Sequence, residues 1–320
     1  MWSLAVIRLV RADEERRDKE PTCKYPLVSL VSFIDIASGL LVLSSWGVAD
    51  FLARMSSVRI GSGSTAFLVQ ALGLAVPATA LCISLALGSD LNVDVGRTLL
   101  LGISTGGILV LAYVVYYNGL ERGSVSIVSA IASAWLVVTL LFAALAFGES
   151  ISWSQATLIG VVVTGIFAVG FQRQSVGVPN AGVSYGLAAM VMLGVALALW
   201  VPLTKAAGPL LAVFTARALA AVVTGGYLWA KGIGLHWPSG RIGVLTLCGA
   251  AALDSLGFVA YNIGIERASL VVIAPFAAAH PVGTIILALL ILGERPVIRQ
   301  WVGMALVVAG VAALSAVAGV

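Results

Sequence analysis

The sequence predicts an all-α membrane protein with ten transmembrane helices arranged as two inverted five-helix repeats. Composition is the first observation: 60% of the 320 residues are hydrophobic and 10% are charged, whereas a soluble globular domain carries about 25% charged residues. The second is a succession of apolar stretches of about 20 residues, the length that crosses a bilayer as a helix. The third is an internal repeat, in which the second half of the chain resembles the first.

The repeat extends to polar and charged positions. Tyr116, Gly119, Glu121, Arg122 and Ser124 recur as Tyr261, Gly264, Glu266, Arg267 and Ser269, and Gly148, Glu149, Gln155 and Gly165 recur as Gly293, Glu294, Gln300 and Gly310. From Tyr116 to Tyr261 the shift is 145 residues, and every other pair keeps it without a gap. Because self-similarity at a fixed spacing marks a repeat architecture, we expect the two halves to fold alike.

Charged residues and clusters of Pro and Gly divide the chain into ten predicted spans. They cover residues 29–52, 64–88, 98–118, 124–147 and 153–172 in the first half, and 182–204, 209–231, 242–263, 269–292 and 299–319 in the second. Polar breaks at 88–97, 231–241 and 293–300 support these divisions. The spans are too long, and alternate too little, to be barrel strands, so helices are expected.

The linker at 172–182 separates two groups of five spans. Because five is odd, the second group enters the membrane in the opposite orientation, which makes the repeat an inverted one. We therefore divide the chain into a tail at 1–26, a first repeat at 27–172 and a second repeat at 182–320.

The tail contains the mixed-charge run RADEERRDKE at 11–20 and no cleavable signal pattern. Its basic residues favour a cytoplasmic N-terminus, although the basic residues of the remaining loops oppose that orientation. Because the first helix usually determines the orientation, the N-terminus is expected in the cytoplasm. The expected location is the cell membrane, plasma or inner, with the lipid bilayer as a partner.

The repeated signatures resemble the EamA domain of the drug/metabolite transporter superfamily. Each half has a GLER or GIER motif, followed by a span that ends in FGES or LGERP, with Gln155 or Gln300 beyond it. The stretch LGERPVIRQWVGMALVVAGV near the C-terminus is especially similar. The resemblance covers residues 30–318 and implies an exporter-like carrier of ten helices with both termini in the cytoplasm. It also implies a central cavity lined by the first four helices of each unit, and it leaves the solute open.

Two ionisable residues lie inside predicted spans. A charged side chain in hydrocarbon costs a few kcal/mol, so each is a functional candidate by default. Asp254 lies in the middle of the span at 242–263. Its carboxylate would either face the cavity and bind a cation or a proton, or lie nearer a membrane interface than the predicted span indicates. Arg217 lies within 209–231 and should face either the cavity, the interpretation that we favour, or a carboxylate such as Asp254.

His280 occupies the centre of the ninth span and is the repeat partner of Trp135. Different residues at equivalent positions indicate an asymmetric site. The histidine would either relay protons, because it titrates near neutrality, or make an interhelical hydrogen bond. Lys205 is a further binding candidate, but it lies near the end of its span, and we favour a side chain that extends to the interface.

Aromatic and amide side chains on the spans around the expected cavity are further candidates for solute contact. They are Trp46, Tyr116, Trp135, Trp200, Tyr261, Asn118 and Asn262. Aromatic residues also mark membrane interfaces, and asparagines near span ends also cap helices, so both interpretations stay open. Asp50 and Arg54 are interpreted as a structural i,i+4 pair. The repeated Glu149 and Glu294 each follow a Gly at the end of a span, and we expect them to cap a helix or to form part of a turn.

An internal repeat in a chain that crosses the membrane many times is typical of secondary transporters. We expect a carrier, an exporter by resemblance, for a small organic metabolite or drug-like solute, coupled to a proton or a counter-substrate. The alternatives are an intramembrane enzyme and a non-transporting scaffold. The sequence does not contain the hydrolase motif HExxH, which argues against the enzyme. Three scattered cysteines lack metal-ligand spacing. No cofactor, metal or nucleic acid is expected, and the protein is expected to be a monomer or homodimer.

Overall fold

A computed structural model describes residues 33–88, 93–147, 151–170, 181–267, 276–277 and 279–318. All regular secondary structure in these ranges is helical. The predicted tail at 1–26 lies outside the described residues, as do Glu149 and Ser269.

Helices occupy all ten predicted spans, at least in part. In the first half they are α2 (Phe33–Ile60), α3 (Ser62–Gly73), α4 (Ala75–Ala86), α5 (Val95–Arg122), α6 (Val125–Ala132), α7 (Trp135–Phe147) and α8 (Trp153–Gly170). In the second half they are α9 (Ala181–Ala207), α10 (Pro209–Ala230), α11 (Gly240–Arg267), α13 (Pro281–Ile291) and α14 (Ile298–Ala318).

Within the described residues, six helical segments are long and apolar enough to cross a membrane. They are Ser62–Ala86, Val95–Arg122, Val125–Phe142, Gly182–Ala207, Pro209–Ala230 and Gly240–Gly264, and shorter apolar helices cover Trp153–Ala168, Pro281–Ile291 and Ile298–Leu314. The chain is therefore a multi-pass membrane protein, whereas crossing by all ten predicted spans stays a prediction.

Two of the predicted spans are divided by a break in the helix. The span at 64–88 is interrupted at Leu74, between α3 and α4. Pro77 explains this break, because proline has no N–H to donate to the carbonyl of Gly73 and its ring clashes with that carbonyl. The span at 124–147 is interrupted between α6 and α7, beside the cavity described below.

The repeated glutamines cap the last helix of each half. Gln155 Oε1 accepts a hydrogen bond from the Ser152 N–H at 2.8 Å, and Gln300 Oε1 accepts one from the Val297 N–H at 2.9 Å. This is the reciprocal half of a capping box, in which a side chain in the first turn satisfies the backbone of the capping residue. The recurrence seen in the sequence therefore has the same local structural role in both halves.

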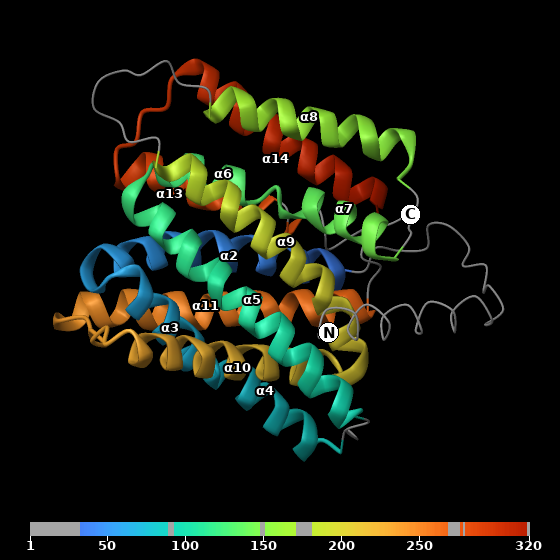
Figure 1. Ribbon diagram of the computed structural model, residues 1–320, viewed down its shortest axis with the longest axis vertical. Helices are drawn as coiled ribbons and strands as arrows, with labels where there is room; N and C mark the ends of the chain where they lie inside the picture. Colours follow the sequence, from blue (N-terminus) through green and yellow to red (C-terminus); the bar gives the residue numbers. More distant parts are fainter. Residues whose placement is uncertain are drawn as a thin grey trace.

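The two halves pack together by exchanging equivalent helices. α2 of the first half lies along α11 of the second half (Figure 1). In the repeat, α9 corresponds to α2 and α5 corresponds to α11, and α9 likewise lies along α5. α8 lies along its own counterpart α14 at one end of the bundle, and α3, α4 and α10 lie at the other end (Figure 1). α5 and α11 run in opposite directions (Figure 1). This exchange is what a pseudo-twofold relation would produce, and it brings residues of both halves together at the centre.

Candidate functional site

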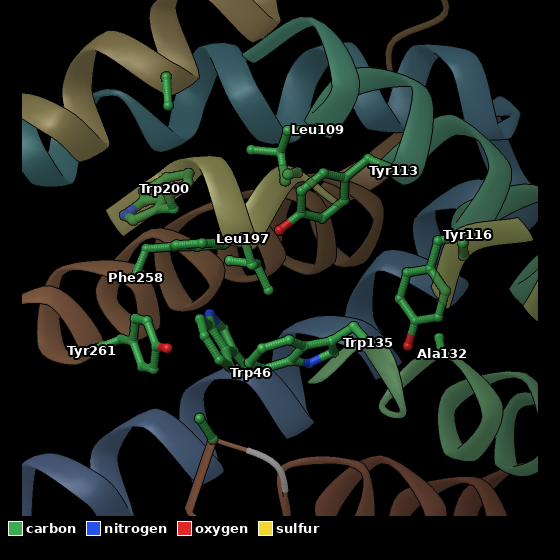
Figure 2. Packing of buried hydrophobic residues seen from close by; sticks show 14 of the residues in the cluster. Trp46, Leu109, Tyr113, Tyr116, Ala132, Trp135, Leu197, Trp200, Phe258 and Tyr261 are labelled. Atoms are coloured by element: carbon green, nitrogen blue, oxygen red, sulfur yellow. The ribbon is translucent and has the colours of Figure 1, made fainter. Parts of the chain in front are cut away.

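A cavity of about 50 Å³ lies between the two halves of the bundle. It is lined by Trp46, Asp50, Tyr113, Tyr116, Ala132, Ser133, Trp135, Leu193, Leu197, Asp254, Phe258 and His280. Figure 2 shows Tyr113 and Leu197 on one side of this space and the two tryptophan rings, Trp46 and Trp135, on the other. Aromatic rings thus form much of the wall. Among the described residues, the wall also contains two carboxylates, those of Asp50 and Asp254, and one imidazole, that of His280.

Arg217 and Asp254 form a buried ion pair at the edge of the cavity. Nη2 of Arg217 donates to Oδ2 of Asp254, and Nη1 donates to Oε1 of Gln70 at 3.1 Å. The Tyr113 hydroxyl donates to the other oxygen of Asp254, Oδ1, at 2.9 Å. The Arg217 Cζ also lies 5.2 Å from the centre of the Phe258 ring. A protein carboxylate and a neutral amide therefore surround the guanidinium.

This arrangement corrects the interpretation of Arg217 that we favoured from the sequence. Arg217 is 1% exposed and does not belong to the cavity wall, whereas Asp254 does. The physical reason is that a guanidinium in a low-dielectric interior is stabilised by the nearest carboxylate, and the packing of α10 against α11 supplies one. Sequence spacing alone contains no information on which helix faces which.

Asp50 is a second carboxylate in the cavity wall, and sequence analysis assigned it only a structural role beside Arg54. Its Oδ2 accepts a hydrogen bond from the Tyr116 hydroxyl at 2.7 Å and lies 3.4 Å from Nε2 of His280. Both sequence candidates, Tyr116 and His280, therefore meet at a residue that we had not selected. One feature of the sequence indicates that Asp50 can reach the cavity: it lies one helical turn after Trp46, which is itself a candidate on the same helix.

Trp46 connects the cavity to a second layer of buried side chains. Its ring centre lies 4.9 Å from that of Phe258 and 5.5 Å from that of Tyr261. Behind Phe258, Trp200 Nε1 donates to Oδ1 of Asn262 at 2.9 Å. Trp200, Tyr261 and Asn262 are buried but lie outside the cavity wall. In this conformation these three candidates support the wall and do not form it.

Two further candidates lie away from the cavity. Asn118 Nδ2 donates to the Val114 carbonyl at 2.8 Å, and Asn118 lines a separate hollow of about 550 Å³ together with Glu121. Lys205 is exposed in the last turn of α9, where a long cationic side chain can extend to the membrane interface. Neither residue contributes a polar group to the cavity wall.

Glu294 joins the two halves at the N-terminus of α6. Its carboxylate accepts hydrogen bonds from the Ser124 hydroxyl at 2.8 Å, the Val125 N–H at 2.6 Å and the Ser126 N–H at 3.1 Å. A carboxylate at this position satisfies N–H groups that have no partner inside the helix and interacts favourably with the helix dipole. The repeated glutamate thus caps a helix, and the helix belongs to the other half of the chain.

Comparison with known proteins agrees with the repeat and the helical fold. A family model described as the EamA-like transporter family matches residues 34–171 and again residues 180–316. A solved structure, described only as "Crystal structure of protein", superposes with a TM-score of 0.63 at 19% identity, over 88% of this chain and 98% of that chain. At this identity the likeness shows the fold alone. No curated protein matches the chain. Because the family model covers both halves, the chain belongs to the EamA-like transporter family.

Proposed function

We propose that the protein is a secondary active transporter that moves a small organic solute across the cell membrane by alternating access. The family match over both halves supports the carrier class. The cavity supports the mechanism, because it lies between the halves and takes side chains from both, as solute sites do in carriers built from inverted repeats. In this proposal all ten predicted spans cross the bilayer, both termini are cytoplasmic, and transport is outward.

The chemistry of the cavity favours a solute with an apolar body and a positively charged amine. Asp50 provides a carboxylate in the wall, whereas Asp254 is already paired with Arg217. Rings such as that of Trp135 provide aromatic faces, which attract cations. Among the described residues of the wall, a solute carboxylate or phosphate lacks an equivalent partner, because Arg217 is already paired with Asp254 and Lys205 lies away from the wall. The cavity thus argues against an anionic or zwitterionic solute.

The size of the cavity supports a conformational change during transport. Its volume of about 50 Å³ holds a few water molecules, whereas sites for small organic ligands measure about 300–1,000 Å³. Solute binding therefore requires the helices around Trp46 and Trp135 to separate. Alternating access provides such a movement, because the halves must move relative to each other to open the cavity to either side.

Ligand titration of the purified protein tests this solute class. We expect benzyltrimethylammonium to bind more tightly than phenylacetate or benzyl alcohol, which present an anion and a neutral group on a similar ring. Trp135→Ala is expected to weaken binding of the cation by about tenfold, because an aromatic face that contacts a desolvated cation contributes about 1.4 kcal/mol. Isothermal titration calorimetry in detergent micelles measures both effects.

Trp153→Ala is the matched control for this substitution. Trp153 is 89% exposed at the start of α8, so the same chemical change there should leave binding unchanged. Tighter binding of phenylacetate than of the cation, or an equal loss in both tryptophan variants, would contradict the proposed solute class.

A further inference from the structure

We propose that Asp50 and His280 together hold one exchangeable proton and form the coupling site of the carrier. The site itself is inferred from geometry, and only its role in coupling rests on the proposed function. Asp50 lies in α2 and His280 immediately precedes α13, and both line the cavity. Their side chains are 10% and 12% exposed. The pair is therefore buried but reachable by a proton through the cavity.

The backbone determines which nitrogen of His280 carries a hydrogen. Nδ1 lies 2.6 Å from the carbonyl oxygen of Ala277, and because a carbonyl only accepts, Nδ1 is the donor. Pro281 leaves this carbonyl available, since proline has no N–H to donate to the oxygen four residues before it. The second nitrogen, Nε2, is therefore the one that gains or loses a proton.

Nε2 faces a carboxylate oxygen. It lies 3.4 Å from Oδ2 of Asp50, and the same oxygen accepts a hydrogen bond from the Tyr116 hydroxyl at 2.7 Å. With no proton on Nε2 or on the carboxylate, the nitrogen lone pair and a negatively charged oxygen would lie close together without a hydrogen between them. One proton removes this repulsion in either arrangement, as an imidazolium beside a carboxylate or as a neutral imidazole beside a carboxylic acid. The geometry thus fits one shared proton.

Among the described residues, the titratable groups around this pair leave its charge uncompensated. They are Tyr113, Tyr116 and Tyr117 on α5, Asp254 and Tyr261 on α11, and Arg54 on α2 itself. Asp254 is already paired with Arg217, and Arg54 interacts electrostatically with Glu121 and Glu294. The helices α3, α6 and α13, which also pack against α2, contain no acidic or basic residue within their described bounds.

The charge balance links the proton to the solute. With one proton bound, the Asp50–His280 pair is neutral, and its loss leaves one negative charge buried in the cavity wall. A positively charged solute in the cavity compensates that charge, so cation binding favours release of the proton. In transport, one cation and one proton would then move in opposite directions, and charge would be conserved at the site.

A pH-induced infrared difference spectrum of the purified protein tests the proton site without any transport. Asp50→Asn keeps the shape of the side chain but removes the carboxylate, and His280→Gln removes the imidazole. Asp94→Asn is the matched control, because Asp94 is exposed at the start of α5 and asparagine also caps helices. We expect the carboxyl and imidazole bands of the pair to persist in the control. The carboxyl band should disappear in Asp50→Asn, and the imidazole band should disappear in His280→Gln.

An infrared difference spectrum that is unchanged in Asp50→Asn would overturn the proton site. The melting temperature of each variant is measured alongside, and if His280→Gln does not fold, the near-isosteric Asp50→Asn decides alone.

Reconstituted vesicles test the role of the site in coupling, with benzyltrimethylammonium as the probe because its charge does not depend on pH. Asp50→Asn is expected to lose accumulation driven by a pH gradient, and whatever exchange remains at equal pH on both sides should no longer depend on the pH chosen. Full gradient-driven accumulation in Asp50→Asn would overturn the coupling role. Absence of transport by the wild type, together with the expected infrared result, would leave the proton site standing and remove the proposed function.

Discussion

Arg217→Met is expected to lower the free energy of unfolding by about 3–5 kcal/mol, because it leaves the carboxylate of Asp254 buried without its cation. Asp254 is 4% exposed, so water cannot take the place of the guanidinium. Gln70 loses its charged donor in the same substitution. Methionine fills much of the volume of the arginine stem, so the loss is mainly electrostatic. Chemical unfolding in detergent micelles, followed by tryptophan fluorescence, measures the effect.

Two further variants separate pairing from packing. Arg217→Met combined with Asp254→Leu is expected to recover most of the lost stability, because apolar side chains can replace a buried ion pair at little cost. Arg241→Met removes an exposed arginine at the start of α11 and should have little effect. A stable Arg217→Met protein, or a double variant as unstable as the single one, would contradict the ion pair.

Arg217→Lys distinguishes a structural guanidinium from one that binds solute. Lysine cannot reach Asp254 and Gln70 with the planar fork that arginine provides. We therefore expect lower thermal stability and equal effects on all solutes. A selective loss of binding by anionic solutes at unchanged stability would show instead that Arg217 faces the solute.

Gly47→Ala is expected to destabilise the protein by about 1–3 kcal/mol, the usual cost of overpacking, and to separate Asp50 from His280. A Cβ on Gly47 would lie 2.8 Å from the carbonyl oxygen of His280 and 3.2 Å from the Cα of Gly283. Thr284 Oγ1 also donates to the Gly47 carbonyl at 3.0 Å in this contact. Small residues allow such close approach of membrane helices, so an added methyl group must push α2 away from α13. Unfolding in micelles and the infrared difference spectrum measure the two effects.

Gly107→Ala is the matched control, since it adds the same methyl group within α5. Apart from its chain neighbours and the backbone of its own helix, a Cβ there has no described atom within 4 Å. We expect unchanged stability or a gain of up to about 1 kcal/mol, because alanine loses less backbone entropy in a helix than glycine does. Equal effects of the two substitutions would contradict the close contact between α2 and α13.

Much of the helical arrangement could be predicted from the repeat and the apolar spans. The predicted spans at 98–118 and 242–263 lie within α5 (Val95–Arg122) and α11 (Gly240–Arg267), and α11 begins and ends 145 residues after α5. The breaks at Leu74 and between α6 and α7 were not predicted. Span detection averages hydrophobicity over many residues, whereas a helix break depends on local features such as the missing N–H of Pro77.

The site could be predicted only in part, because its contacts join helices that are distant in the sequence. Asp254, Arg217 and His280 were identifiable as ionisable residues in apolar surroundings, which makes each a functional candidate. Their partners depend on helix packing, which the repeat does not specify. Asp50 was overlooked because Arg54, four residues later, offered a plausible local partner, whereas the structure places Asp50 beside His280 of the other half.

Counterflow in reconstituted vesicles tests most directly the central claim that this protein is a carrier with its solute site between the two halves. Vesicles loaded with unlabelled benzyltrimethylammonium are diluted into a trace of the labelled ion. An alternating carrier predicts a transient accumulation of label above its equilibrium level, reduced in Trp135→Ala and unchanged in Trp153→Ala. Label that enters only to equilibrium, as through a channel, or that does not enter at all, as expected for an enzyme or a scaffold, would contradict the claim.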